Sequence, residues 1–123
     1  MRTLLVVDGA NVVGADPAGE WWKDRAGAAA RLHESLMTAD TSYDDVVLVL
    51  EGQAKQGVRA GRDAHLRTVH APGNGDDTIV REARLGVEKG RVVAVVTADR
   101  RLKDRVHALG ATTLGPTWLL ERL

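Results

Sequence analysis

The residues of this sequence that are most able to do chemistry are acidic, and each follows a short apolar run or a loop. In chain order these acidic residues are Asp8, Glu51, Asp76, Asp77 and Asp99. Carboxylates gathered in one place repel one another, and at about 5 Å and an effective dielectric near 20 each like-charged pair costs roughly 3 kcal/mol. A bound cation relieves that repulsion more simply than protonated carboxyl groups do. If the fold brings these residues together, they therefore predict a cation site.

Three valine-rich runs predict the strands that would carry these acids. The runs are "LLVV" (4–7), "VVLVL" (46–50) and "VVAVV" (92–96). Their apolar residues are continuous rather than alternating, which is typical of parallel strands covered by helices on both faces. Weaker strand patterns occur at 66–69 and 111–114.

Helical patterns lie between the strands. Apolar residues recur at helical spacing in 24–38, 76–88 and 100–109, and Pro116 can open a short final helix. Strands that alternate with helices indicate right-handed crossovers. We therefore expect one α/β domain over 1–123, a three-layer α/β/α sandwich with a central, mainly parallel five-stranded sheet. In such a sheet the working crevice lies outside the carboxyl ends of the strands, where the acidic residues are expected.

Composition narrows what could neutralise the acidic residues. The chain has no cysteine, and none of its four histidines follows the strands that carry the acids, so the available ligands are hard oxygen atoms. Oxygen ligands select Mg²⁺ or Mn²⁺ over Zn²⁺. Each acid taken alone also has an ordinary structural role open to it, as a turn residue, a helix cap or a solvated side chain.

Three motifs surround the acidic residues, in the order "VDGANVVG", "GDDTIV" and "VVTADRRL". Together they resemble the NYN branch of the PIN-like nucleases, close to its YacP-type members. The resemblance implies a PIN-like fold that holds Mg²⁺ or Mn²⁺ on aspartates and cleaves RNA. The catalytic residues that it implies are Asp8, Asn11, Asp76, Asp77 and Asp99. Glu51 stands where relatives often carry aspartate in an "FDG"-like turn.

On this hypothesis the metal ligands are drawn from Asp8, Glu51, Asp76, Asp77 and Asp99. We expect Asp8 and Asp99 to bind the metal directly, with either Asp76 or Asp77 as the third ligand. The other acid of that pair and Glu51 would act through bound water or as a base. Asn11 could steady Asp8 or a water molecule, or could make only a local turn bond, and Thr97 could bond a neighbouring carboxylate or serve only as a strand residue.

Basic and aromatic residues flank the acidic positions and could attract RNA. The formal net charge is zero, with 17 acidic and 17 basic residues, so a nucleic-acid partner must be met by a local patch. The RNA-binding candidates are Lys55, Arg59, Arg62, Arg67, Arg100, Arg101 and Trp22. The basic side chains would contact phosphates, and a tryptophan could stack on a base. Solvated surface positions and ordinary packing are the alternative readings.

The expected function is a metal-dependent ribonuclease that acts in the cytoplasm on single-stranded or structured RNA. A non-catalytic RNA-binding adaptor of the same fold and a nucleotide phosphohydrolase remain as alternatives. The sequence has no G-x-G-x-x-G after a strand and no G-K-[ST], so it predicts neither a dinucleotide site nor a P-loop. It also lacks an apolar run of roughly 20 residues and a signal-peptide pattern, so we expect no membrane partner. A protein partner or a homo-oligomer is left open.

Overall fold

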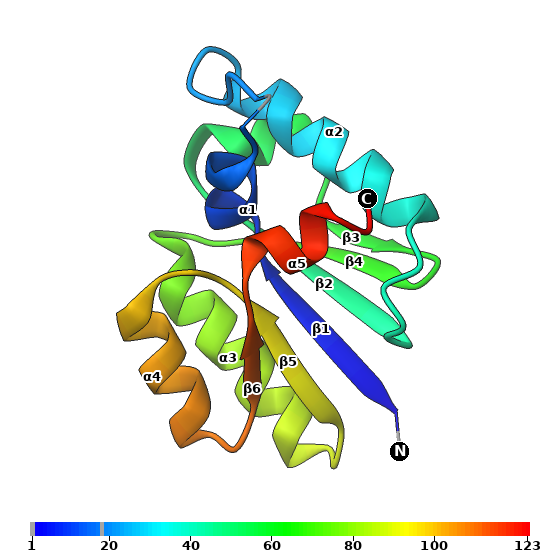
Figure 1. Cartoon of the computed structure of the whole chain (residues 1–123), viewed down its shortest axis with the longest axis vertical. Helices are drawn as coiled ribbons and strands as arrows, with labels where there is room; N and C mark the ends of the chain where they lie inside the picture. The colour runs from blue at the N-terminus through cyan, green and yellow to red at the C-terminus, as the bar shows by residue number, and fades with distance from the viewer. Residues whose placement is uncertain (1, 18) are drawn as a thin grey trace.

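A six-stranded sheet forms the centre of the molecule in a computed structural model that describes residues 2–17 and 19–123 (Figure 1). The strands are β1 (Thr3–Asp8), β2 (Asp45–Leu50), β3 (Gly61–Asp63), β4 (Leu66–His70), β5 (Val92–Val96) and β6 (Thr112–Leu114). Their order across the sheet is β3-β4-β2-β1-β5-β6. Neighbouring strands are parallel, except that β3 runs antiparallel to β4.

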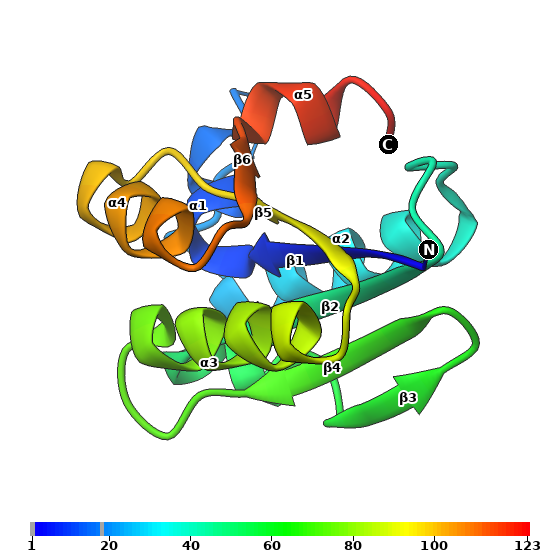
Figure 2. The same ribbon diagram turned by 90° about the horizontal axis from the view of Figure 1, so that it is seen from below.

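Helices cover both faces of the sheet. They are α1 (Gly9–Ala15), α2 (Arg25–Thr38), the 3-10 helix η1 (Gly52–Gly57), α3 (Gly75–Glu88), α4 (Arg100–Ala108) and α5 (Pro116–Leu120). Helices α1, α2 and α5 lie on one face, and α3 and α4 lie on the other (Figures 1 and 2). The predicted three-layer α/β/α sandwich is therefore confirmed. No helix within the described ranges is long and apolar enough to cross a membrane.

The continuous apolar runs are explained by the two cores that they fill. In β1, Leu4 and Val6 belong to the core under α3 and α4, whereas Leu5 and Val7 belong to the core under α1, α2 and α5. Successive side chains of a strand point to opposite faces, so a strand buried on both faces needs an apolar residue at every position. The run is then interrupted only where the strand ends, at Asp8.

The sheet has one strand more than the sequence predicted. All five predicted strands are present within about two residues of their expected bounds. The sixth, β3, consists of three exposed residues with no apolar pattern. Helix α1 was also not predicted. It begins directly after Asp8 at Gly9, where a Cβ atom would lie 2.7 Å from the carbonyl oxygen of Val49, so glycine lets the helix start close to β2.

The carboxyl end of β1 lies at the topological switch point of the sheet. From β1 the chain crosses one face through α1 and α2 to β2, on one side of β1. It later returns through α3 on the opposite face to β5, on the other side of β1. Ligands of open parallel sheets bind in the crevice that such a reversal leaves at the carboxyl ends of the strands.

Candidate active site

Asp8 is a buried carboxyl group at the carboxyl end of β1, with only 7% of its surface exposed. Its Oδ1 accepts a hydrogen bond from the backbone N–H of Asn11 at 3.3 Å, which caps α1, and its Oδ2 accepts one from the hydroxyl of Thr97 at 3.0 Å. Burial raises the pKa of Asp8 from 3.8 to about 6, against these two hydrogen bonds. The charges of Asp76 and Glu51 raise this pKa further. The negative charge of Asp8 is therefore only partly compensated by its two hydrogen bonds, and neighbouring carboxylates oppose it.

Thr97 and Asn11 join the segment after β5 to the start of α1. The fully buried hydroxyl of Thr97 donates to Asp8 and accepts a hydrogen bond from the backbone N–H of Asp99 at 3.1 Å. The side-chain oxygen of Asn11 accepts from the backbone N–H of Ala98 at 2.8 Å. These bonds fix the two segments at the switch point to one another, so Asp8 and Asp99 are positioned together.

Glu51 and Asp99 each accept a hydrogen bond at the start of a helix. Asp99 is the N-cap of α4, and its Oδ1 accepts from the backbone N–H of Leu102 at 3.0 Å. The Oε2 of Glu51 accepts from the backbone N–H of Gly75, the first residue of α3. The partial positive charge of a helix N-terminus stabilises a nearby carboxylate. Both acids thus have a structural role in addition to their place at the carboxyl end of the sheet.

Asp76 and Asp77 are neighbours in α3 but have different surroundings. The pKa of Asp76 is raised by partial burial and then by the charges of Asp99 and Glu51. The side chain of Asp77 is largely exposed, and its Oδ1 lies 3.0 Å from a guanidinium nitrogen of Arg105 in α4. The structure therefore groups Asp76 with the other acids and pairs Asp77 with a base.

Four carboxylates thus lie at the carboxyl end of the sheet, and we call them the acidic edge: Asp8, Glu51, Asp76 and Asp99. Electrostatic repulsion links them, since Asp76 and Glu51 act on Asp8, and Asp99 and Glu51 act on Asp76. None of the four forms an ion pair with any residue that the structure describes.

The donor atoms of the acidic edge are of the type that Mg²⁺ and Mn²⁺ bind. All of the donors are carboxylate oxygens, and each carboxylate keeps lone pairs beyond those used by its present hydrogen bonds. Over residues 2–17 and 19–123, however, no three acidic or histidine side chains already form a cluster that could hold a metal ion. The side chains would therefore have to turn toward a common point to bind one.

The basic residues predicted to bind RNA divide into two groups. Arg100 and Arg101 are exposed in the first turn of α4, directly after Asp99, and neither forms an ion pair within the described ranges. Lys55 lies in η1 after β2, and its ammonium group donates to the carbonyl oxygen of Ala71 at 2.9 Å. These three residues are at the carboxyl side of the sheet.

Two of the other predicted basic residues, Arg62 and Arg67, lie away from the acidic edge. Arg67 is near the start of β4 and pairs with Glu82 of α3, and Arg62 lies 3.6 Å from Asp45 at the start of β2. Because parallel strands begin at the amino edge of the sheet, both arginines are at the end opposite the acids. Arg59 is exposed between η1 and β3. The structure therefore does not bring Arg62 and Arg67 together with the acidic edge, whereas Arg59 follows Val58, whose carbonyl oxygen lies 2.7 Å from Nε2 of His70 at the carboxyl end of β4.

Trp22 was predicted to bind RNA, but its neighbour Trp21 is the tryptophan that lines a pocket with a residue of the acidic edge. Trp22 is 58% exposed, and its ring meets the ring of Trp21 edge to face at a centroid distance of 6.2 Å. Trp21 instead lines a pocket that also contains Glu51. The adjacency of the two residues in "EWWK" offered no signal to separate them.

Two crystal structures of Rae1 (YacP) from Bacillus subtilis have a fold similar to that of this chain. A tryptophan-to-leucine mutant of Rae1 superposes with a TM-score of 0.73 at 19% identity, over 98% of this chain and 74% of its own. The other Rae1 structure gives a TM-score of 0.72 at 20% identity, over 98% and 72%. Neither a protein-family model nor a curated protein sequence matches this chain. The chain therefore shares with Rae1 (YacP) a three-layer α/β/α PIN-like fold.

Proposed function

We propose that this protein is a ribonuclease that hydrolyses RNA phosphodiester bonds with Mg²⁺ or Mn²⁺ held at the acidic edge. The observation that supports this most is that the carboxylates near the switch point of the sheet raise the pKa of Asp8 and of Asp76 and that the four form no ion pair among the described residues, although the charge of Arg105 partly offsets the repulsion at Asp76. The resemblance of the motifs around Asp8, Asp76 and Asp99 to the NYN branch of the PIN-like nucleases points the same way. The fold shared with Rae1 (YacP) agrees with it.

The proposed ligands are the members of the acidic edge. Asp8 and Asp99 would hold the ion directly, Asp76 would be the third ligand, and Glu51 would act through water or as a base. The bound ion would lower the pKa of a water molecule and stabilise negative charge on the phosphate and the leaving oxygen. Asp77 is a poorer ligand than Asp76, because its carboxylate is paired with Arg105.

The residues around the acids would keep them in position for this reaction. The hydroxyl of Thr97 orients Asp8, and the backbone N–H groups of α3 and α4 orient Glu51 and Asp99. These hydrogen bonds limit how far the carboxylates must turn to reach a common ion, which reduces the conformational freedom lost on binding. Arg100 and Arg101 would contact the phosphates of the RNA on the α4 side.

A cleavage assay tests the proposal. Purified protein is incubated with labelled single-stranded and structured RNA in Mg²⁺, in Mn²⁺ or in a chelator. We expect cleavage with at least one of the two ions and none in the chelator. Binding without cleavage in either ion would instead identify an adaptor, and hydrolysis of free nucleotides alone would identify a nucleotide phosphohydrolase.

Two neighbouring substitutions provide a matched control. Asp76→Asn and Asp77→Asn each remove one carboxylate from the first turn of α3, so they change the helix dipole interaction to a similar extent. We expect Asp76→Asn to lower the cleavage rate by more than about 100-fold, because loss of even an outer partner of a metal ligand costs about 10- to 100-fold. Asp77→Asn should cost less than about tenfold. Equal losses in the two variants would contradict the assignment of Asp76.

A further inference from the structure

A pocket of about 430 Å³ adjoins the acidic edge and is not used by the proposed hydrolysis. Its wall includes Gly9 and Ala10, which directly follow Asp8, and also Glu51, which belongs to the acidic edge. The indole of Trp21 and the side chain of Arg25 form another wall. We call it the Trp21 pocket. The Trp21 pocket and the acidic edge are therefore neighbours, because Glu51 belongs to both and Gly9 directly follows Asp8.

The lining of the Trp21 pocket combines an aromatic ring and an arginine with apolar residues. The guanidinium carbon of Arg25 lies 5.4 Å from the centre of the Trp21 ring, within the range of a cation–π contact. Ala29 and Leu50, which are buried in the core on this face of the sheet, also line the pocket. Aromatic rings and arginine planes beside apolar surface are the groups on which unpaired nucleobases stack.

The rim of the pocket carries glycines rather than bulky side chains. A Cβ atom added to Gly52 or Gly73 would meet no other atom within 4 Å, so the space at both positions is open. A base can enter through such a rim only if it is unpaired, because in a duplex both of its faces are stacked and its pairing edge is occupied. The pocket therefore favours single-stranded RNA over structured RNA.

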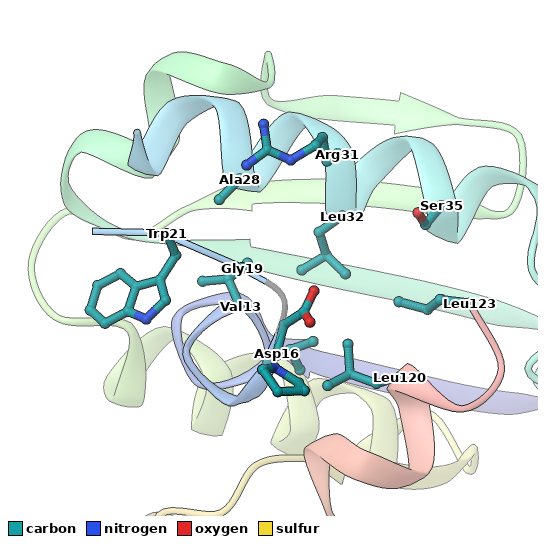
Figure 3. Close-up of a pocket in the computed structure, with 12 residues that line it drawn as sticks. Val13, Asp16, Gly19, Trp21, Ala28, Arg31, Leu32, Ser35, Leu120 and Leu123 are labelled. Carbon is teal, nitrogen blue, oxygen red and sulfur yellow. The ribbon is translucent and has the colours of Figure 1, made fainter. Parts of the chain in front are cut away.

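A second pocket of similar size shares Trp21 and Val13 with the Trp21 pocket. It measures about 410 Å³ and lies between α1, α2 and the C-terminal segment (Figure 3). Figure 3 shows Trp21 at one end of it, Arg31 of α2 above it, and Leu123 toward the other end. No residue of the acidic edge lines this second pocket. The second pocket can therefore serve as a control site for experiments on the Trp21 pocket.

We propose that the Trp21 pocket binds one unpaired nucleobase of a single-stranded RNA whose adjoining phosphate lies at the acidic edge. This inference rests on the proposed function and adds the substrate class to it. The base stacks against the Trp21–Arg25 wall, and the positive charge of Arg25 attracts the phosphate that connects this base to its neighbour. The pocket thereby sets which phosphodiester bond of the strand reaches the carboxylates.

The test measures binding rather than cleavage. A fluorescently labelled single-stranded RNA is titrated with the protein in Ca²⁺, which carboxylate oxygens bind and which offsets their repulsion of the phosphate, and binding is followed by fluorescence anisotropy on RNA that a gel shows to be uncleaved. A set of otherwise identical RNAs carries one abasic residue that is moved along the strand. We expect at least one position at which the abasic residue weakens binding on the order of tenfold, as loss of a stacked base does.

Three variants test the inference: Trp21→Leu removes a ring that lines both pockets, whereas Arg25→Ala and Arg31→Ala distinguish the two pockets. Trp21→Leu and Arg25→Ala should each reduce the position-dependent loss to less than about twofold, because the stacking partner is removed. Arg31→Ala is the matched control, since it removes one arginine from the same helix α2 but lines the second pocket. It should retain the full positional effect. Arg25→Ala also serves if Trp21→Leu fails to fold, which circular dichroism would detect.

The other outcomes overturn the inference. An equal effect of the abasic residue at every position, or no measurable RNA binding by the native protein, would show that no base is held in a pocket. Loss of the positional effect in Arg31→Ala but not in Arg25→Ala would place the base in the second pocket. Failure of the proposed ribonuclease function is a separate result, because it would appear as absent cleavage in Mg²⁺ and Mn²⁺ while this binding pattern persisted.

Discussion

The two ends of the central sheet surround their acidic residues in opposite ways. At the amino end, Asp45 of β2 accepts hydrogen bonds from the guanidinium groups of Arg2, at 2.9 Å, and Arg91. Glu82 of α3 is also buried there and pairs with Arg67. At the carboxyl end, the four carboxylates of the acidic edge have no such partners among the described residues.

The pKa values of two buried aspartates follow this difference. Burial alone would raise the pKa of Asp45, but the hydrogen bonds and charges of Arg2 and Arg91 outweigh it and hold this pKa below its ordinary value. Burial raises the pKa of Asp8 to about 6, and neighbouring carboxylates add to the effect. The comparison indicates that Asp45 contributes to stability at neutral pH, whereas ionised Asp8 reduces it. Unfavourable charge retained in a crevice is characteristic of a functional site.

The same chemical change at these two aspartates should have opposite effects on stability. In metal-free protein at pH 7, Asp8→Asn should raise the free energy of unfolding by up to about 3 kcal/mol, because a pKa raised by roughly 2 units corresponds to that energy. Asp45→Asn should lower it by about 1–3 kcal/mol, because bonds to charged arginines are lost. Urea denaturation in a chelator measures both. Asp8→Asn should also lower the rate of RNA cleavage by more than about 100-fold. Shifts of the same sign would refute the comparison.

The stability difference between native protein and Asp8→Asn should depend on pH. The native fold binds the Asp8 proton more tightly than the unfolded chain does. Protonation of Asp8 therefore stabilises the native protein fully below pH 3.8, and this stabilisation is lost as the pH rises through about 6. The stability advantage of Asp8→Asn should therefore be near zero at pH 4 and reach up to about 3 kcal/mol above pH 6. Denaturation curves of both proteins across this range give the profile. An advantage that is constant with pH would exclude ionisation of Asp8 as its cause.

A divalent metal should stabilise the protein only through the carboxylates at the carboxyl end of the sheet. At a concentration about 100 times its dissociation constant, Mn²⁺ should raise the free energy of unfolding of the native protein by about 2.7 kcal/mol. The same titration should have little effect on Asp8→Asn and should remain fully effective in Asp45→Asn. Thermal unfolding at several Mn²⁺ concentrations measures this. Stabilisation of Asp8→Asn equal to that of the native protein would place the metal elsewhere.

The smallest expected effect is a change in the salt dependence of RNA binding, which should differ between arginines at the carboxyl end and at the amino end of the sheet. Replacing both Arg100 and Arg101 with alanine should weaken RNA binding and reduce the slope of log K against log salt by about 1.4, since each phosphate contact to a single strand contributes about 0.7. Arg62→Ala should leave the slope unchanged, because Arg62 lies beside Asp45 at the amino end. Binding titrations at several salt concentrations give the slopes. A reduced slope in Arg62→Ala would mean that RNA also crosses the amino end.

Five strands were predicted, and β1, β2 and β5 most clearly, because each of these three contains a continuous apolar run. A strand buried on both faces must be apolar throughout, so its run of valines and leucines stops where the strand does, as at Asp8 and Glu51. The strand β3 has no such pattern. Its residues Gly61, Arg62 and Asp63 are exposed, and they form a strand only because the edge of β4 provides backbone partners.

The candidate site was predictable in its composition but not in its details. The sequence could not separate Asp76 from Asp77, because both occupy the first turn of α3 and consecutive residues of a helix differ by about 100° in direction. The packing of α3 on the sheet turns Asp76 toward the other acids and leaves Asp77 beside Arg105. The pairing of Arg67 with Glu82 was equally hidden, since these residues are far apart in the chain.

Local sequence patterns were thus sufficient to predict a layered α/β protein with acidic residues at the carboxyl ends of its strands. They could do so because burial and strand ends impose constraints on consecutive residues. Only the tertiary packing produces the separation of Asp76 from Asp77, the compensation of Asp45 and Glu82, and the pocket beside Trp21. Charges and cavities depend on which distant segments the crossovers bring together, and that information is not contained in the spacing of neighbours along the chain.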